Sequence, residues 1–318
     1  MIILNKAIEV GRQAALAAGA VLRQNYLKPQ HITLKSAIDP VTETDLQSQE
    51  TIINLIRQTF PDHGFLAEEI VGEGAKGHRP LAPPPHPLPQ TLKGKDLPQG
   101  ARPRASPPAA PLQGWEGGWG GGQGAALPGP PPKSIHLSPY RWIIDPLDGT
   151  VNFAHGFPVF CVSIAFEAEG IVEYGVVYDP LREELFEAKR GGGATLNGEP
   201  VRVSAVDRLD AALLATGFPY DIRERLPETL ARLGRVMGQA QGVRRAGSAA
   251  LDLCYVASGR LDGFFEENLK PWDTAAGTLI VTEAGGLIST FKGEAYELTS
   301  PDIAVSNGLI HTEILKCL

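Results

Sequence analysis

The chain has 318 residues, 43% of them hydrophobic, and a formal net charge of −7. This hydrophobic content is enough for a folded core and excludes global disorder, and the lack of clustered Lys and Arg argues against nucleic acid as the main partner. Three scattered cysteines fit neither a disulfide framework nor a zinc site, and no apolar run reaches membrane-spanning length, so we expect a cytoplasmic protein that does not associate with membranes.

The N-terminal residues predict two helices and a short strand. Apolar periodicity favours a helix over about 4–27 and a second helix over about 44–59, which Pro61 closes. Residues 65–67 predict a strand that ends at the acidic pair Glu68–Glu69. This order places two carboxylates at the end of a strand early in the chain.

The composition changes abruptly between residues 72 and 139. From Pro80 to Pro139 the chain holds 16 of its 27 prolines, together with a glycine-rich stretch at 114–122. Without periodicity this segment cannot bury a core, so we expect a disordered insert. Extending a loop about fourfold adds only about 1 kcal/mol of closure entropy. We therefore expect residues 1–71 and 140–318 to form one fold around the insert.

The C-terminal half predicts antiparallel strands first and an alternation of strands and helices afterwards. Apolar runs over about 158–167, 171–178 and 184–188 are typical of strands, and the Asn197–Gly198 turn predicts a hairpin between 194–196 and 201–203. The alternating part is expected to contain strand 211–216, helices 222–238 and 248–258, strand 261–266, helix 274–284, strands 287–290 and 302–305, and a final helix.

The six residues 145–150 (DPLDGT) are the most informative segment of the chain. They follow an apolar stretch that predicts a buried strand. A proline within them fixes the backbone as the chain turns, so Asp145, Asp148 and the Leu147 carbonyl can face one point. Crowded carboxylates raise one another's pKa or bind cations, and hard divalent cations prefer oxygen ligands. The segment therefore predicts a magnesium-type site.

The end of the same segment indicates an anion site. Gly149 permits close backbone approach, and a helix that begins near Thr150 would offer free N–H groups and a positive dipole end to a phosphate. The structural alternative is that Asp148 only caps this helix and Asp145 only ends the strand.

Two further acids are candidates for the same place. Glu68 would reach it if strand 65–67 lies beside 141–144; the alternative is an exposed acidic pair on a loop. Asp273 precedes the predicted helix 274–284, where it would be a good N-cap for purely structural reasons.

Thr150 and Asp45 form a candidate activating pair. A threonine hydroxyl can take a proton from water if a carboxylate orients it. As alternatives, Asp45 is a favourable first-turn acid of the second helix and Thr150 a helix N-terminal hydroxyl. Lys35 could steer an anion, although a lone lysine is usually only solvated.

The region before the last strands supplies candidates for substrate hydroxyls. Gly247, Ser248 and Ala249 begin a predicted helix and offer backbone donors. Glu266 ends a predicted strand and could accept a hydrogen bond from a hydroxyl, or it could be an ordinary surface carboxylate.

Five segments together resemble the inositol monophosphatase family, within the lithium-sensitive, magnesium-dependent phosphatases. They are 39–45 (DPVTETD), 65–69 (FLAEE), 142–153 (WIIDPLDGTVNF), 247–250 (GSAA) and 272–277 (WDTAAG). The resemblance implies an α/β fold of α+β type, a layered αβαβα sandwich of the sugar-phosphatase type. It also implies an N-terminal α+β part to about 205, a C-terminal α/β part over about 206–318, and a homodimer.

The resemblance further implies two or three Mg²⁺ ions and roles for individual residues. The implied metal ligands are Glu68, Asp145, the Leu147 carbonyl, Asp148 and Asp273, and the implied catalytic residues are Thr150, Asp45 and Glu68. Gly149 and Thr150 would bind phosphate, and the substrate hydroxyls would be bound by Asp148, Gly247, Ser248, Ala249 and Glu266.

The prediction is a Mg²⁺-dependent phosphomonoesterase that hydrolyses myo-inositol monophosphate or a similar polyol or sugar phosphate. Histidinol phosphate and fructose 1,6-bisphosphate remain as alternative substrates within the same superfamily. An alternative of another class is a catalytically weak regulatory or binding protein on this fold.

Overall fold

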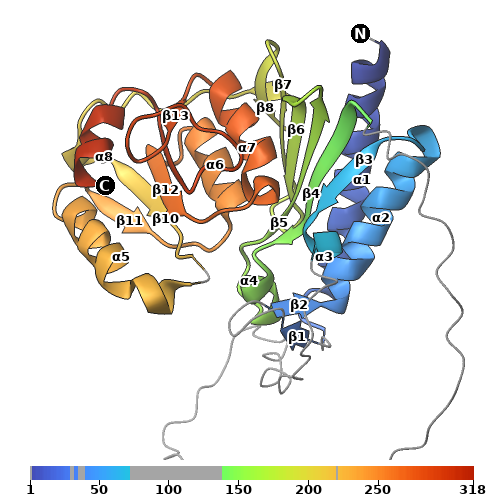
Figure 1. Cartoon of the computed structure of the whole chain (residues 1–318), viewed down its shortest axis with the longest axis horizontal. Helices are drawn as coiled ribbons and strands as arrows, with labels where there is room; N and C mark the ends of the chain where they lie inside the picture. The colour runs from blue at the N-terminus through green and yellow to red at the C-terminus, as the bar shows by residue number, and fades with distance from the viewer. Residues whose placement is uncertain (1, 29–31, 35–39, 72–137, 220) are drawn as a thin grey trace, which may run out of the picture. The chain divides into compact units, whose positions relative to one another are not determined.

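The computed structural model of the chain describes residues 2–28, 32–34, 40–71, 138–219 and 221–318, all within one contact unit. The predicted insert at 72–139 lies outside these residues apart from its last two, and Lys35 also lies outside them. The described residues form alternating layers of helices and sheets, the predicted αβαβα order (Figure 1).

The larger sheet has seven strands in the part of the chain that the structure describes, in the order β3-β4-β5-β6-β7-β8-β9. Every neighbouring pair is antiparallel except β3 and β4, which are parallel. The strands are β3 (Gly64–Ala67), β4 (Tyr140–Asp148), β5 (Cys161–Ala168), β6 (Ile171–Asp179), β7 (Glu184–Lys189), β8 (Gly193–Leu196) and β9 (Glu199–Pro200).

Both faces of this sheet are covered. Helices α1 (Ile2–Asn25) and α2 (Glu43–Thr59) pack on one face, while α6 (Ala249–Ala257) and α7 (Pro271–Glu283) pack on the other (Figure 1). Along β4, Trp142 and Ile144 belong to the core shared with α1 and α2, and Ile143 belongs to the core shared with α6 and α7. Burial on both sides explains why β4 is a continuous apolar run rather than an alternating one.

The smaller sheet has five strands among the described residues, in the order β11-β10-β12-β14-β13. Its strands are β10 (Leu213–Thr216), β11 (Gly242–Arg244), β12 (Gly263–Glu267), β13 (Leu287–Ser289) and β14 (Asp302–Ser306). Helices α5 (Ile222–Met237) and α8 (His311–Cys317) form the outermost layer beyond this sheet (Figure 1). The chain therefore carries α6 and α7 between two sheets.

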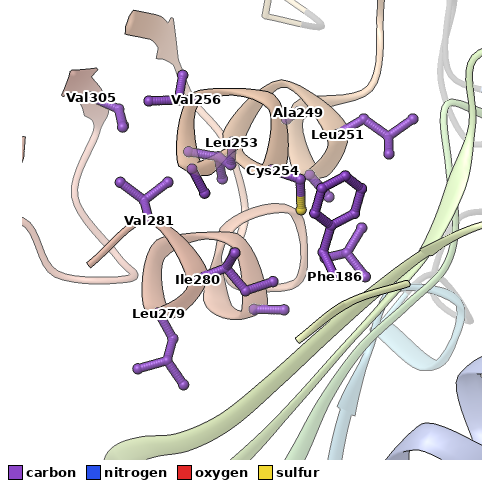
Figure 2. Packing of buried hydrophobic residues seen from close by; sticks show 14 of the residues in the cluster. Phe186, Ala249, Leu251, Leu253, Cys254, Val256, Leu279, Ile280, Val281 and Val305 are labelled. Atoms are coloured by element: carbon purple, nitrogen blue, oxygen red, sulfur yellow. The ribbon is translucent and has the colours of Figure 1, made fainter. Parts of the chain in front are cut away.

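Helices α6 and α7 hold the main core together. Figure 2 shows Leu253 and Cys254 of α6, Ile280 of α7 and Phe186 of β7 gathered in one apolar cluster. Close approach of α7 to the larger sheet depends on Gly175 of β6, because a Cβ there would lie 2.8 Å from the Ala276 carbonyl oxygen. This contact sets the distance between α7 and the larger sheet, and Asp273 lies in the first turn of α7.

Four short elements border the loop between β4 and β5. They are β1 (Ile32–Leu34), β2 (Pro40–Thr42), α3 (Glu68–Val71) and α4 (Thr150–Ala154). A 3-10 turn at Leu209–Ala211 precedes β10, so the predicted strand 211–216 begins two residues later than expected. No helix in the described part of the chain combines the length and apolar character needed to cross a membrane.

Other predicted boundaries were also wrong, two of them for a clear physical reason. The strand expected at 201–203 is absent, because β9 ends at Pro200 and the Val203 N–H donates to the Ala284 carbonyl at the end of α7. Helix α7 begins at Pro271, three residues earlier than predicted, because proline at the first helical position loses no needed hydrogen bond. Asp273 is therefore the third residue of this helix and not its N-cap.

Candidate active site

The parallel pair β3–β4 brings Glu68 next to Asp145. Ala67 pairs with Ile144, so the residues that follow each strand leave the sheet at the same edge. The charge of Glu68 is one of the causes that raise the pKa of Asp145. The condition that 65–67 lies beside 141–144 is thus met, and Glu68 is close enough for its charge to act on Asp145.

The segment 145–150 turns through an irregularity at the end of β4. The register with β5 shifts between Asp145 and Asp148, and an Asp145 Oδ1 accepts a hydrogen bond of 3.0 Å from the Leu147 N–H. Gly149 has φ +96°, and a Cβ there would lie 2.8 Å from the Val159 carbonyl oxygen, so this position requires glycine. Helix α4 begins at the next residue, as predicted.

The candidate activating pair is present as a direct hydrogen bond. The Thr150 hydroxyl lies 3.0 Å from Asp45 Oδ1 and 3.0 Å from the Leu147 carbonyl oxygen. Asp45 is fully buried, and its Oδ2 accepts from the Thr42 N–H at 2.8 Å and the Thr42 hydroxyl at 2.6 Å. Asp45 therefore caps α2 with one oxygen and orients Thr150 with the other.

The N-terminus of α6 holds Asp148 from the opposite side. Asp148 Oδ2 accepts from the Ser248 hydroxyl at 2.6 Å and from the Ala250 N–H at 2.8 Å. Ser248 is the N-cap of α6, as the predicted helix start requires. The backbone donor to Asp148 is Ala250, one residue beyond the predicted 247–249, so the first turn of α6 is already hydrogen-bonded to the site.

Asp273 approaches from α7. Its Oδ2 accepts a hydrogen bond of 2.7 Å from the backbone N–H of Lys270, the N-cap residue of the helix. The Asp273 side chain is partly exposed and lines the cavity described below. The charges of Asp148 and Glu68 are among the causes that raise its pKa. Glu68, Asp145, Asp148 and Asp273 therefore form one electrostatic cluster, although they come from three separate parts of the chain.

Burial is the largest cause of the raised pKa values in this cluster. It raises the pKa of Asp145 and Asp273 well above the ordinary range and that of Asp148 to about 6, and the mutual repulsion of the carboxylates adds to the effect. Among the described residues, Asp145, Asp148 and Asp273 form no ion pair with Lys, Arg or His. The part of the chain that the structure describes thus gives these three carboxylates hydrogen-bond donors but no ion-pair partner.

A cavity of about 150 Å³ lies against this cluster. Its wall includes eight of the residues predicted from sequence: Asp148, Gly149, Thr150, Gly247, Ser248, Ala249, Glu266 and Asp273. Glu266 is buried, which raises its pKa to about 8, and the charge of Arg245 opposes that rise. Its carboxylate occupies the position that a Cβ on Gly217 would take, at 1.9 Å from Oε2.

Comparison with known proteins decides the family. The sequence profile described as "Inositol monophosphatase family" matches residues 4–318. The chain belongs to the inositol monophosphatase family. A "Nus factor SuhB" from Pasteurella multocida is 38% identical over 98% of this chain and 96% of the relative. An "Inositol-1-monophosphatase" from Synechocystis is 38% identical over 98% of this chain and 88% of the relative.

Solved structures of the family share the fold. The extragenic suppressor protein suhB from Bartonella henselae aligns with a TM-score of 0.75 at 33% identity, covering 98% of each chain. The inositol monophosphatase from Anabaena aligns with a TM-score of 0.71 at 34% identity, covering 99% of this chain and 95% of that one. The resemblance predicted from five short segments is confirmed, and so is the layered fold that it implied.

The donor set of this inositol monophosphatase family member suits hard divalent cations. It consists of carboxylate and carbonyl oxygens with uncompensated charge, which is the chemistry that Mg²⁺ prefers. Within the described residues, no three His, Cys, Asp or Glu side chains are grouped closely enough to hold a metal ion. One oxygen each of Asp145, Asp148 and Asp273 instead accepts from a protein donor. The assignment of metal ligands stays a prediction.

Sequence reasoning missed several residues of the cavity wall, among them Arg245 and Asp252. Arg245 lies over the Phe218 ring, 5.3 Å from its centroid, and Asp252 is 2% exposed on α6. A signal for Asp252 was available: it is the single charged residue in the apolar helix 249–257. Four positions separate it from Ser248, so it follows the N-cap by about one helical turn.

Proposed function

We propose that the chain is a Mg²⁺-dependent phosphomonoesterase that hydrolyses myo-inositol monophosphate or a similar polyol phosphate. The observation that carries this proposal is that Asp145, Asp148 and Asp273 crowd together with no ion pair among the described residues, beside the Thr150–Asp45 hydrogen bond and the cavity that Glu266 lines. Membership of the inositol monophosphatase family supports a phosphatase. The relative from Synechocystis, named for inositol 1-monophosphate, supports this substrate class.

The metal ions would be held by Glu68, Asp145, the Leu147 carbonyl, Asp148 and Asp273, with two or three ions per site. When bound, divalent cations of this kind neutralise a phosphate ester and provide hydroxide near neutral pH. The raised pKa values mean that the carboxylates lose protons as cations bind, so affinity for the metal would rise with pH.

The chain's own groups position the water and the phosphate. Asp45 orients the Thr150 hydroxyl, which lies within hydrogen-bond distance of an acceptor on each side and can take a proton from the attacking water as it passes its own proton to Asp45. The backbone N–H groups of Gly149 and Thr150 would bind the phosphate. Direct attack by water needs no nucleophilic side chain, and no phosphoenzyme forms.

The alcohol portion of the substrate would lie against the opposite wall. Glu266, with a pKa of about 8, is largely protonated at neutral pH, so it can donate one hydrogen bond to a hydroxyl and accept another. Asp148, Gly247, Ser248 and Ala249 would complete this surface. Histidinol phosphate and fructose 1,6-bisphosphate are the alternative substrates of the proposal, since their alcohol portions could also bind to this wall.

A second candidate function is favoured by the relatives named "Nus factor SuhB", a name that states no enzyme activity. On this reading the chain also binds a protein partner. The homodimer and the cytoplasmic location implied by the resemblance belong to the proposal as well, as does one catalytic fold that spans 1–71 and 140–318.

The deciding experiment is phosphate release from inositol 1-phosphate, histidinol phosphate and fructose 1,6-bisphosphate in the presence of MgCl₂. We expect Asp273→Asn to lose at least about 10²-fold in kcat, because a charge that stabilises the transition state is removed. Asp210→Asn is the matched control, since its side chain is 59% exposed and lies outside the cavity. Unchanged hydrolysis by Asp273→Asn would exclude the mechanism.

A deletion of residues 76–136 tests the proposed organisation. Equal rates for the full chain and the shortened chain would make the insert a passive segment. Loss of hydrolysis on deletion would assign it a part in the active fold.

A further inference from the structure

Asp252 is a buried acid that the proposed mechanism does not use. Its side chain is 2% exposed, and its Oδ1 has no hydrogen-bond partner in the described structure. The described residues give its carboxyl group neither a side-chain hydrogen bond nor an ion pair. Leaving a buried polar group without a partner costs about 1–3 kcal/mol, so a fold retains such a group only where something else requires it.

The position of Asp252 shows where its partner would come from. It lines the same cavity as Asp148, Glu266 and Asp273. Other buried polar atoms without partners belong to Arg141, Asp221, Thr229 and Arg232, and none of these residues lines that cavity. Among the described residues, Asp252 alone combines an unsatisfied atom with a place in the cavity wall.

The surroundings select the chemistry of the partner. The charges that act on Asp252 include the positive charge of Arg245 and the negative charge of Asp148. Burial raises the pKa of Asp252 well above its ordinary range, which favours the protonated form, and a protonated carboxyl group can both donate and accept. A neutral acid matches a hydroxyl, which also donates and accepts, better than it matches an ammonium group.

We propose that Asp252 is a further binding residue of this cavity, whose carboxyl group hydrogen-bonds a hydroxyl on the alcohol portion of the substrate. The inference rests on the proposed function in taking the substrate to be a phosphorylated polyol. It extends the hydroxyl-binding wall from Glu266 and the start of α6 to the fourth residue of that helix. Asp252 would then favour hydroxyl-rich alcohols over apolar ones.

The test compares two substrates with two variants. Asp252→Ala is expected to lower kcat/KM for inositol 1-phosphate about 2- to 12-fold, the effect of one hydrogen bond, and to leave p-nitrophenyl phosphate unchanged because its alcohol portion carries no hydroxyl. Asp252→Asn keeps a donor and an acceptor and should stay within about twofold of the wild type. The proposal would be overturned if Asp252→Ala kept the wild-type ratio of kcat/KM for inositol 1-phosphate to kcat/KM for p-nitrophenyl phosphate. It would also be overturned if the variant lost hydrolysis of histidinol phosphate alone.

Thermal stability separates binding from structure. Without ligand, Asp252→Ala should be at least as stable as the wild type, because it removes an unsatisfied group. The control Asp262→Ala removes an equally buried carboxylate that accepts from the Ser204 hydroxyl at 2.5 Å and the Leu213 N–H at 2.6 Å, and it should lower the melting temperature. A clear loss of stability in Asp252→Ala would contradict the proposed role.

Ligand-induced stabilisation separates this inference from the proposed function. If the wild type hydrolyses nothing but inositol 1-phosphate raises its melting temperature, and Asp252→Ala loses that rise, the inference stands and the proposed enzyme activity fails. If hydrolysis of inositol 1-phosphate is equal in both, the enzyme activity stands and the inference fails. If the wild type shows neither hydrolysis nor stabilisation, both fail.

Discussion

Glu167 and Asp145 lie at opposite ends of the strand pair β4–β5, and both are buried, with 7% and 2% exposure. Glu167 faces Arg141 across the pair and forms an ion pair of 2.9 Å with it. Asp145 faces Ser163 and is surrounded by the charges of other acids. The same two strands therefore hold, at one end, a buried acid paired with an arginine and, at the other end, a buried acid without an ion pair among the described residues.

The contrast extends to the rest of the larger sheet. Away from the cavity, buried acids have arginines: Glu187 pairs with Arg12 at 2.9 Å and Asp179 with Arg182 at 2.8 Å. Beside the cavity, the described residues provide Asp145, Asp148 and Asp273 with hydrogen-bond donors but no ion pair. Because these acids of the larger sheet pair with arginine where they lie away from the cavity, the acids beside the cavity that lack an ion pair indicate a place for an external cation.

The sharpest test of this comparison is Asp145→Asn. We expect kcat for inositol 1-phosphate to fall at least about 10²- to 10³-fold, and the melting temperature in the presence of a chelator to rise, because the substitution relieves repulsion among buried carboxylates. Glu167→Gln is the matched control and should show the opposite pattern, lower stability with unchanged hydrolysis. A destabilised but active Asp145→Asn would show that the two ends of the strand pair do not differ in this way.

The ion pair between Arg12 and Glu187 gives a prediction about stability. Arg12→Met keeps an apolar stem but leaves Glu187 with only the Tyr174 hydroxyl, at 2.6 Å, as a partner for its buried carboxylate. We expect a loss of about 1–3 kcal/mol in the free energy of unfolding, measured by urea denaturation, and no change in substrate affinity. If stability were unaffected, ion pairing would not explain how this sheet tolerates buried acids.

The sequence could reveal the convergence of the acids because simple rules of strand order govern it. The two apolar runs that end in acids could be recognised, but their pairing entered the sequence argument only as a condition, and the structure shows that β3 and β4 are parallel neighbours. The start of α6 at Ser248 and the helix after Gly149 are likewise local signals. Family membership could be predicted from the order of five motifs.

What the sequence could not reveal depends on contacts between distant residues. The sequence predicts Asp273 as an N-cap, but the helix begins earlier, at Pro271. The Asp273 carboxylate consequently accepts a hydrogen bond from the Lys270 N–H. Residues 201–203 read as a strand, but the end of α7 takes their hydrogen bond. Asp252 belongs to none of the recognised motifs. Only the folded structure shows that its Oδ1 lacks a hydrogen-bond partner and that the residue lines the cavity.

The smallest effect we predict concerns pH and Glu266. Burial raises its pKa from 4.5 to about 8, and the charged groups that face it are Arg245, Asp252, Asp148 and Asp273. The folded state therefore binds this proton more tightly than the unfolded state. The resulting stability is fully present below about pH 4.5 and is lost as the pH rises to about 8.

Glu266→Gln isolates this contribution. In chelator, the melting temperature of the wild type should fall more steeply between about pH 4.5 and 8 than that of Glu266→Gln, because the amide cannot ionise. Asp210→Asn serves as the control, because its side chain is 59% exposed and its removal should leave the slope between about pH 4.5 and 8 unaltered. Parallel curves for the wild type and Glu266→Gln would mean that Glu266 is already ionised in the folded protein. It would then belong with the compensated acids of the sheet, and the contrast between the two regions would apply only to the acids at the ends of β3 and β4 and at the start of α7.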